Sequence, residues 1–252
     1  MSSTLPDAIA AATLIVMRDA IDADPDILMV ERAGVMAFAP GAMVFPGGRV
    51  DAADVALADL LDLPEDGAAR LAAIRETIEE AGLAICITPS LDADALAKAR
   101  VALRDGASLA DALTPLGAAP DPAALVPFAR WRPDRTRIRR FDTRFYLAAL
   151  PADAPPPLVD GTENVRLCWA SARAVLADAE AGRLTLIFPT RRNLERLARF
   201  GSYAAAVEHA RATPVRTVVP WIETRDGEDW ICIPDGLGYP VTAERLADAR
   251  RA

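Results

Sequence analysis

The chain has 252 residues, of which 52% are hydrophobic, and a formal net charge of −8. This composition suits one globular domain with a packed core, and the negative charge argues against a general nucleic-acid-binding role. The sequence has no run of about 18 uncharged apolar residues, and its start, MSSTLPDAIAAATLIVMRD, lacks the basic region of a signal peptide. We therefore expect a cytoplasmic protein with no membrane partner.

The first half of the chain predicts several short strands and two groups of helices. The β-rich runs ATLIVMRD and DILMVERA flank the turn signal AIDADP and predict a strand pair, and GAMVFPGG predicts a third strand. A helix ending at Gly82 follows, and then AICIT predicts another strand. Residues of about 89–127 are alanine-rich and predict two helices outside the main sheet.

The second half of the chain predicts further strands, helices and a final hairpin. RRFDTRFYLAAL and NVRLCWAS predict strands on either side of a loop, followed by a helix over 172–181 and one or two helices from Pro189. RTVVPWIETRDGEDWICIP is typical of a β-hairpin. Because strands and helices do not alternate strictly, we expect an α+β fold, with one domain over 8–212 and the hairpin and tail of 213–252 packed on it.

The residue types most often used in zinc and thiol chemistry are sparse. The three cysteines, Cys86, Cys168 and Cys232, are far apart and flanked by apolar residues, which predicts buried free thiols. A single histidine, His209, excludes a multi-histidine zinc site, and its helical surroundings predict a position on a helix surface.

The helix predicted over 70–83 carries three crowded glutamates, Glu76, Glu79 and Glu80. Like charges at i,i+3 and i,i+4 repel by a few tenths of a kcal/mol, and acidic groups in the last turn face the negative end of the helix dipole. The apolar stripe on the opposite side consists of Leu71, Ile74, Ile78 and Ala81. Either the glutamates form a solvated acidic face, or a divalent cation that prefers oxygen ligands relieves the repulsion.

Arginine is concentrated in one short segment. Seven arginines fall within 130–144, offset by Asp134 and Asp142: Arg130, Arg132, Arg135, Arg137, Arg139, Arg140 and Arg144. In an acidic protein this concentration suits an anionic small ligand better than a polymer, and a solvated loop is the simpler alternative.

The segment RETIEEAGL is similar to the second half of the Nudix hydrolase box, and FPGG, with Gly47 and Gly48, is similar to its start. Counting from Gly48 places Asp54 at the first acidic position of that box, and twenty residues instead of seven separate it from Arg75. The insertion resembles the coenzyme A and acyl-coenzyme A diphosphatase branch of the peroxisomal type. The resemblance implies a Nudix fold, in which helices enclose a mixed β-sheet, with a helical insertion at about 89–127 and a C-terminal β-hairpin.

The resemblance also implies a hydrolase that cleaves the diphosphate of coenzyme A or acyl-coenzyme A into 3′,5′-ADP and (acyl-)4′-phosphopantetheine. By position, Glu76, Glu79 and Glu80 are implied as ligands of Mg²⁺ or Mn²⁺. Glu79 and Glu163 are alternative general bases, and Arg75 is expected to hold the box loop and the Glu79 carboxylate.

For substrate binding, Gly47 and Gly48 are expected to allow tight backbone conformations, and Arg139 and Arg140 either to grip a 3′-phosphate or to lie on an exposed edge strand. Trp131 is expected in the core or as a loop anchor, as is Trp169. Two other functions stay open: a nucleoside-diphosphate-X hydrolase acting on ADP-ribose or nucleotide sugars, and a nucleotide sensor without catalysis. The helical insertion is a candidate homodimer interface.

Overall fold

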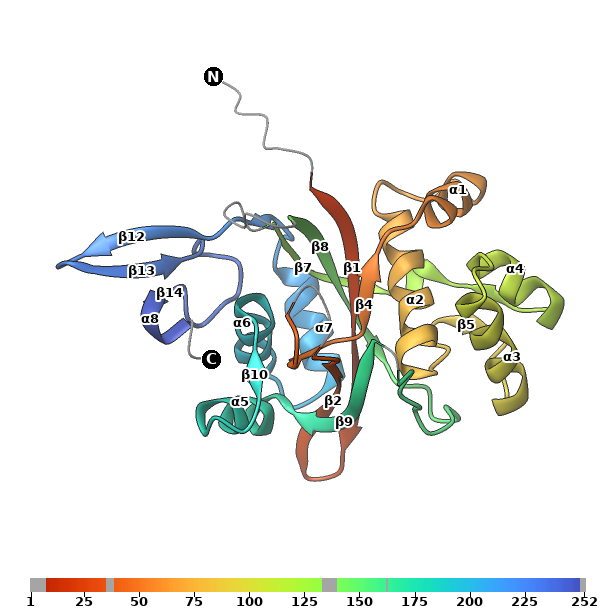
Figure 1. The fold of residues 1–252 in the computed structure, drawn as a ribbon, viewed down its shortest axis with the longest axis horizontal. Coiled ribbons are helices and arrows are strands. Elements are labelled where there is room, and N and C mark those ends of the chain that lie inside the picture. Colours follow the sequence, from red (N-terminus) through yellow and green to blue (C-terminus); the bar gives the residue numbers. More distant parts are fainter. Residues whose placement is uncertain (1–7, 35–38, 133–139, 162, 250–252) are drawn as a thin grey trace, which may run out of the picture.

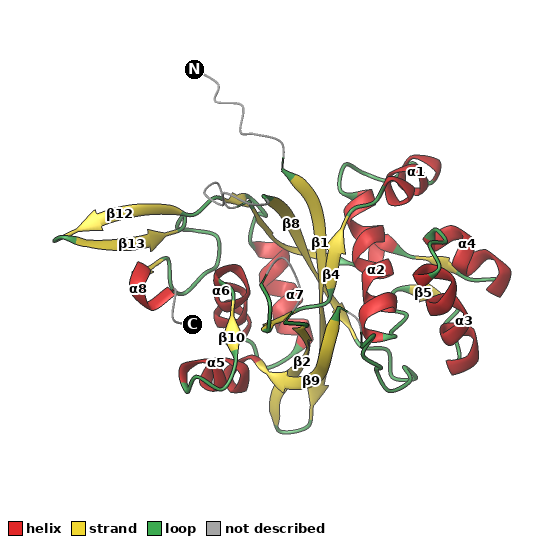
Figure 2. Ribbon diagram, in the orientation of Figure 1, coloured by secondary structure: helices red, strands yellow, loops and turns green. Residues whose placement is uncertain are grey.

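A mixed β-sheet lies between two groups of helices in this computed structural model, which describes residues 8–34, 39–132, 140–161 and 163–249 (Figures 1 and 2). This arrangement confirms the predicted α+β class. The strands of the main sheet are β1 (Ile9–Ala20), β2 (Ala23–Arg32), β3 (Ala42–Val44), β4 (Gly47–Arg49), β7 (Val126–Trp131), β8 (Phe141–Ala149), β9 (Asn164–Ser171), β10 (Thr185–Leu186) and β11 (Thr217–Val218). The larger helices are α1 (Ala52–Leu60), α2 (Gly67–Ala81), α3 (Ala93–Arg104), α5 (Ala172–Glu180), α6 (Phe188–Leu197) and α7 (Tyr203–Ala212).

Strand β1 organises the sheet, whose order is β10-β3-β2-β1-β8-β7-β11. It is parallel to β8 along one edge, whereas along the other it pairs antiparallel with β4 in its first half and with β2 in its second half. Strand β9 also pairs with β2. The β4 pairing sets Gly47 opposite Thr13 and thereby brings the glycine pair beside the middle of the sheet.

Residues of β1 alternate between two hydrophobic cores, as expected for a strand with both faces covered. Leu14 and Val16 pack with α2, α3 and α4 (Leu109–Leu113). Ile15 and Met17 pack with α5, α6 and α7 on the opposite face. The sheet therefore fixes α2 on one side and α6 on the other.

The insertion differs in part from its prediction. Helices α3 and α4 confirm the expected helix pair, and they are followed by short 3₁₀ turns at Thr114–Leu116 and Pro122–Ala124. The predicted range of 89–127 ends inside strand β7, however. Helix α1, which lies earlier in the chain within the split box, was not predicted. The predicted strand AICIT shrinks to β5 (Ile87–Thr88), which pairs with β6 (Ala119–Pro120), because Cys86 takes a left-handed conformation with φ 56°.

The C-terminal hairpin has the predicted form, with β12 (Trp221–Arg225) antiparallel to β13 (Glu228–Cys232). Strand β14 (Ala243–Arg245) completes a separate three-stranded sheet, and helix α8 (Leu246–Ala249) follows it. This sheet projects from the body of the molecule (Figure 1), but the segment between β13 and β14 returns to the core through Ile233, Leu237 and Tyr239.

The cysteines and the histidine are less uniform than predicted. All three cysteines are free, but only Cys232 is buried, whereas Cys86 and Cys168 are half-buried. The ring of His209 lies 4.7 Å from the ring of Phe200 and is half-buried on α7, so it is not on an open helix surface. Within the described ranges, no helix combines the length and apolar character needed to cross a membrane.

Candidate active site

Helix α2 forms as predicted, but its acidic side is not solvated. The stripe of Leu71, Ile74, Ile78 and Ala81 is fully buried, and Gly82 ends the helix with a left-handed φ of 61°. Glu80 is only 5% exposed, because α2 is covered by the sheet as well as by neighbouring helices. The solvated-face alternative is therefore wrong for Glu80, whereas Glu76 and Glu79 keep 17% and 26% of their side-chain surface exposed.

Arg75 holds together the two separated parts of the box. Its guanidinium donates to both carboxylate oxygens of Asp54, at 3.2 and 3.0 Å, and to the backbone carbonyl of Arg49 at 2.8 Å. It also donates to Glu76 and Glu79, each at 2.9 Å. Burial alone would lower the pKa of Arg75, but hydrogen bonding and charge from its acidic partners outweigh burial and raise it. The inserted residues therefore leave Asp54 in contact with Arg75.

Two carboxyl groups beside Arg75 hold protons unusually strongly. Burial raises the pKa of Glu76 to about 7, and the charges of Glu79 and Glu163 add to this effect while Arg75 opposes it. Burial, together with the charge of Glu76, raises the pKa of Glu80 to about 8. The cause is desolvation combined with like charge, a combination that often marks a functional site.

Positions 47 and 48 require glycine because neighbouring atoms lie too close for a Cβ atom. A side chain on Gly47 would place its Cβ 2.3 Å from the Ala12 carbonyl oxygen, and one on Gly48 would place it 2.3 Å from Glu76 Oε1. The backbone N–H of Gly47 donates to Glu80 Oε2 at 2.9 Å. Gly47 thus lets strand β4 lie against β1, and Gly48 lets it lie against the Glu76 carboxylate of α2.

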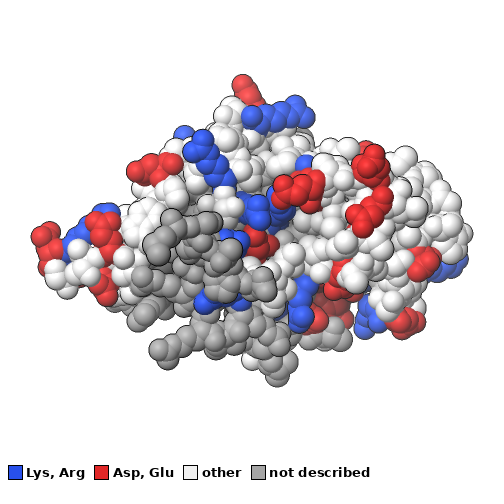
Figure 3. All heavy atoms as spheres, turned by 90° about the horizontal axis from the view of Figure 1, so that it is seen from above, with Lys and Arg blue, Asp and Glu red and all other residues white. Residues whose placement is uncertain are grey.

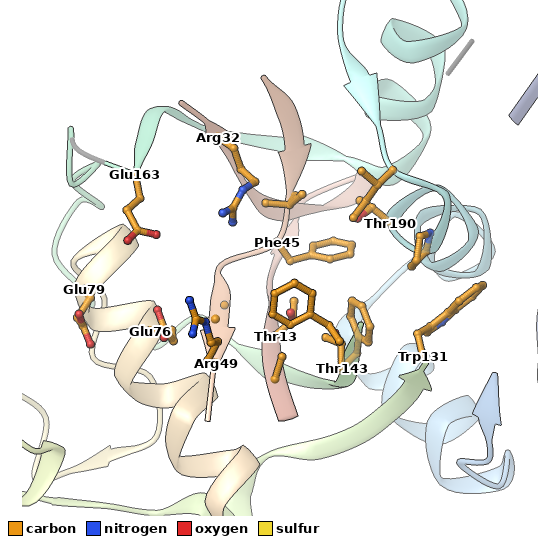
Figure 4. A pocket seen from close by; sticks show the side chains of 18 of the residues that line it. Thr13, Arg32, Phe45, Arg49, Glu76, Glu79, Trp131, Thr143, Glu163 and Thr190 are labelled. Atoms are coloured by element: carbon orange, nitrogen blue, oxygen red, sulfur yellow. The ribbon is translucent and has the colours of Figure 1, made fainter. Parts of the chain in front are cut away.

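A pocket of about 470 Å³ opens onto these groups. Glu76, Glu79 and Glu163 lie toward one end, and Trp131 and Thr190 lie toward the other (Figure 4). Between and around them the pocket is lined mainly by apolar and small polar side chains from β1, β8, the start of α6 and the segment between β3 and β4: Thr13, Phe45, Phe141, Thr143, Phe145, Ile187 and Pro189. An acidic end that continues into an aromatic end suits a ligand with a charged centre and a flat ring.

The other residues singled out from the sequence fall in different places. Glu163 lines the acidic end, although it lies on the loop before β9, far from α2 in the sequence. Arg140 precedes the pocket residue Phe141 but is not part of the lining, and Arg139 lies outside the described residues. Trp131 lines the pocket, whereas Trp169 packs under the guanidinium of Arg18 at 4.6 Å.

Sequence reasoning missed most of the pocket wall. Arg32 and Arg49 add positive charge near the acidic end, and Phe45, Phe141 and Thr190 form the remainder of its shape. Phe45 belongs to the FPGG stretch, so its place next to the glycines was a usable signal. Arg49 directly follows the same stretch, whereas Arg32, Phe141 and Thr190 lie elsewhere in the sequence and have no motif that marks them.

The residues present fit a divalent cation. Glu76, Glu79 and Glu80 supply hard oxygen donors of the kind that Mg²⁺ and Mn²⁺ prefer, and burial together with like charge raises the pKa of Glu76 and of Glu80, an effect that a bound cation would oppose. Among the described residues, no group of three or more acidic, histidine or cysteine side chains is already arranged so that it could hold a metal ion. Here Arg75 holds Glu76 and Glu79 by hydrogen bonds.

Comparison with known proteins agrees with this geometry. A family model, the NUDT19 Nudix domain, matches residues 56–197, which is more than half of the chain. The chain belongs to this Nudix family. A crystal structure of a Nudix hydrolase from Alicyclobacillus acidocaldarius is 31% identical, covers 83% of this chain and 97% of its own, and superposes with a TM-score of 0.69. The implied Nudix fold is therefore confirmed.

Two curated members of the Nudix family are similar in sequence. Acyl-coenzyme A diphosphatase NUDT19 of Gallus gallus is 28% identical over 236 residues, and that of Homo sapiens is 27% identical over 230 residues. The matches cover 71% and 70% of this chain, which spans about 62% and 61% of the length of these relatives. The resemblance to that branch of the Nudix proteins is thus confirmed.

Proposed function

We propose that this protein is a metal-dependent diphosphatase that hydrolyses coenzyme A or acyl-coenzyme A. The observation that carries the proposal is the pocket, in which the carboxylates of the box meet the glycine pair at one end and aromatic rings line the other. The names of the chicken and human relatives support coenzyme A species as substrates. Water adds to one phosphorus atom, the bridging P–O bond breaks, and 3′,5′-ADP and (acyl-)4′-phosphopantetheine leave.

In this proposal the acidic end binds the diphosphate together with Mg²⁺ or Mn²⁺, held by Glu76, Glu79 and Glu80. When bound, such an ion neutralises phosphate charge and makes water more acidic. Arg75 keeps the carboxylates and the box loop in place through its contacts to Asp54 and Glu76. The absence of side chains at Gly47 and Gly48 lets β4 lie against Thr13 and against the carboxylate of Glu76, which holds the box loop beside the ligands.

Glu163 is the better supported general base. Glu79 is engaged by Arg75 at 2.9 Å, whereas the exposed carboxylate of Glu163 points toward the pocket (Figure 4). Because Glu163 lies on the loop before β9, it can take a proton from water at the acidic end while the ion pair between Arg75 and Glu79 stays intact. Glu79 then acts as a ligand of the cation.

Glu163→Gln is expected to lower kcat by about 10²-fold or more, because amide nitrogen and oxygen cannot accept the proton of the attacking water. The affinity for Mg²⁺, measured by calorimetry, should change little. Glu180→Gln, on the remote helix α5, serves as the matched control and should keep full activity. A larger loss of Mg²⁺ affinity than of kcat would contradict the role of Glu163 as base.

Arg140 is proposed to contact the 3′-phosphate of coenzyme A. One of its guanidinium nitrogens is buried and has no hydrogen-bond partner among the described residues, and the next residue, Phe141, lines the pocket. Arg139 is included in this proposal by its position in the sequence alone. Among the described residues, basic and acidic side chains are interspersed on the face shown in Figure 3.

Purified protein should cleave coenzyme A and its acyl esters faster than ADP-ribose or nucleotide sugars, with Mg²⁺ or Mn²⁺ present. Product release can be followed by chromatography of 3′,5′-ADP. Faster cleavage of ADP-ribose would contradict the proposal that coenzyme A species are the substrates, but it would still agree with a diphosphatase. A cytoplasmic location and a homodimer through the helical insertion stay predictions from the sequence.

A further inference from the structure

Trp131 forms the wall at the aromatic end of the pocket. It is the last residue of β7, is only 1% exposed and still lines the pocket. Its indole packs edge-on against Phe188 at 5.8 Å between ring centroids, and Phe188 begins helix α6. Because so little of the indole is accessible, a small rotation of this ring would change the shape of the space that a ligand can enter.

A buried chain of hydrogen bonds fixes the indole. Trp131 Nε1–H donates to the Tyr239 hydroxyl oxygen at 2.8 Å, and the same hydroxyl donates to Asn193 Oδ1 at 3.0 Å. The two rings also pack edge-on, with centroids 5.5 Å apart at 79°. Asn193 is fully buried and Tyr239 is 9% exposed, so water does not compete freely for these bonds.

Tyr239 belongs to the C-terminal segment, outside the stretch of 56–197 that matches the family model. The segment is held closely against α6: a Cβ on Gly238 would lie 2.9 Å from Arg196 Nε and 2.6 Å from His209 Nε2. Arg196 in turn donates to a backbone carbonyl of β7, that of Phe128, at 2.8 Å. This part of the tail is therefore built into the structure behind the pocket.

The same helix that receives Tyr239 also contributes directly to the pocket. Asn193 lies on α6, and Thr190, Pro189 and Ile187 at the start of this helix line the aromatic end. The hydroxyl of Tyr239 thus ties together the indole of β7 and helix α6, whose first turn forms the neighbouring piece of wall. Loss of that hydroxyl would leave both the indole N–H and the Asn193 carbonyl oxygen without their partner.

We propose that Tyr239 is a positioning residue that holds Trp131 so that the aromatic end of the pocket accepts the purine base of the nucleotide half of the substrate. This inference rests on the proposed function and deepens it by assigning the base to that end. Flat aromatic walls suit a planar base, for which stacking and edge-on contacts are favourable. Tyr239 touches neither the diphosphate nor the carboxylates, so its influence falls on binding of the base and not on hydrolysis.

Tyr239→Phe is expected to raise KM for coenzyme A about five- to tenfold, the effect of losing the buried hydrogen bond that fixes the Trp131 indole, while kcat stays within about twofold. In a Trp131→Phe background, which already lacks the indole donor, the same change should raise KM by less than it does in the unmodified protein, because only the bond to Asn193 is then lost. Tyr203→Phe, on α7, is the matched control and should leave KM unchanged. A lower kcat together with a lower melting temperature, and no change in KM, would overturn the positioning role.

Calorimetry with the separate halves of the substrate tests the assignment of the base. Tyr239→Phe should weaken binding of 3′,5′-ADP about five- to tenfold and leave binding of 4′-phosphopantetheine unchanged. An equal loss for both halves, an unchanged affinity for 3′,5′-ADP, or no binding of 3′,5′-ADP by the unmodified protein would overturn the inference. Tyr239-dependent binding of 3′,5′-ADP by a protein that cleaves no coenzyme A species would support the inference and reject the proposed function.

Discussion

Replacing Glu80 with glutamine is expected to lower kcat for coenzyme A hydrolysis by roughly 10³-fold, while the protein remains folded. Stabilisation of phosphate charge by a bound cation is worth several kcal/mol, and each 1.36 kcal/mol corresponds to a factor of ten in rate. Glu80 is 5% exposed and accepts a hydrogen bond from the Gly47 backbone. The amide of glutamine can still accept that bond, so the local structure should persist.

The same substitution should make the metal-free protein more stable at alkaline pH. The pKa of Glu80 rises from an ordinary 4.5 to about 8 because the group is buried and lies near Glu76. The folded state therefore holds the proton more tightly, and this contribution to stability is present below about pH 4.5 and lost as the pH rises through about 8. In metal-free buffer, the gain in melting temperature from Glu80→Gln should be greater at about pH 9 than at about pH 6.

Metal and a surface control complete this test. Mg²⁺ should raise the melting temperature of the unmodified protein and have much less effect on Glu80→Gln, because only the former retains the full ligand set. Glu65→Gln removes a glutamate whose side chain is 87% exposed and should alter neither activity nor the response to Mg²⁺. Full activity in both Glu76→Gln and Glu80→Gln would reject the proposed hydrolase.

The sequence predicted what local patterns encode. The apolar stripe of α2 and its end at Gly82 follow from helical periodicity and from the conformational freedom of glycine, and both were correct. The burial of Glu80 could not be predicted in this way, since it depends on how β4 and the neighbouring elements cover the helix. Periodicity describes one face of a helix, whereas the surroundings of the other face are set by the whole fold.

The two ends of the pocket differ in how well the sequence predicted them. Two carboxylates of the acidic end, Glu76 and Glu79, lie with Glu80 within five residues of one helix, so their crowding was visible. The aromatic end brings together residues from β7, β8 and α6, and Trp131 was expected only as a core or loop anchor. The contact from Tyr239 to Trp131 spans 108 residues of sequence, a separation across which a single sequence gives no pairing information.

The split of the box shows how a missing helix affected the prediction. Asp54 was left outside the metal set because twenty residues separate it from Arg75. Helix α1 was not recognised, yet it begins just before Asp54 and returns this side chain to Arg75 at 3.0 Å. The aspartate also caps its own helix, since its carboxylate accepts from the backbone N–H of Asp51 at 2.9 Å. A buried ion pair therefore joins the two halves across the insertion.

Arg75→Met is expected to lower the free energy of unfolding by about 3–5 kcal/mol, because it leaves Asp54 as a buried carboxylate without its cation. Asp54 is 2% exposed, and Arg75 is 7% exposed. Urea unfolding measures the loss. The matched control is Arg173→Met, which removes an exposed ion pair with Asp24 and should cost no more than about 1 kcal/mol.

A double-mutant cycle then separates the buried pair from the rest of the Arg75 contacts. Asp54→Asn in the Arg75→Met protein removes the unpaired charge and should restore part of the lost stability, although Asp54→Asn alone is destabilising. Recovery should be incomplete, because Arg75 also donates to the Arg49 carbonyl and to Glu76 and Glu79. Simple additivity of the two substitutions would mean that Asp54 and Arg75 are not coupled. In that case the insertion would have separated the two halves of the box energetically as well as in sequence.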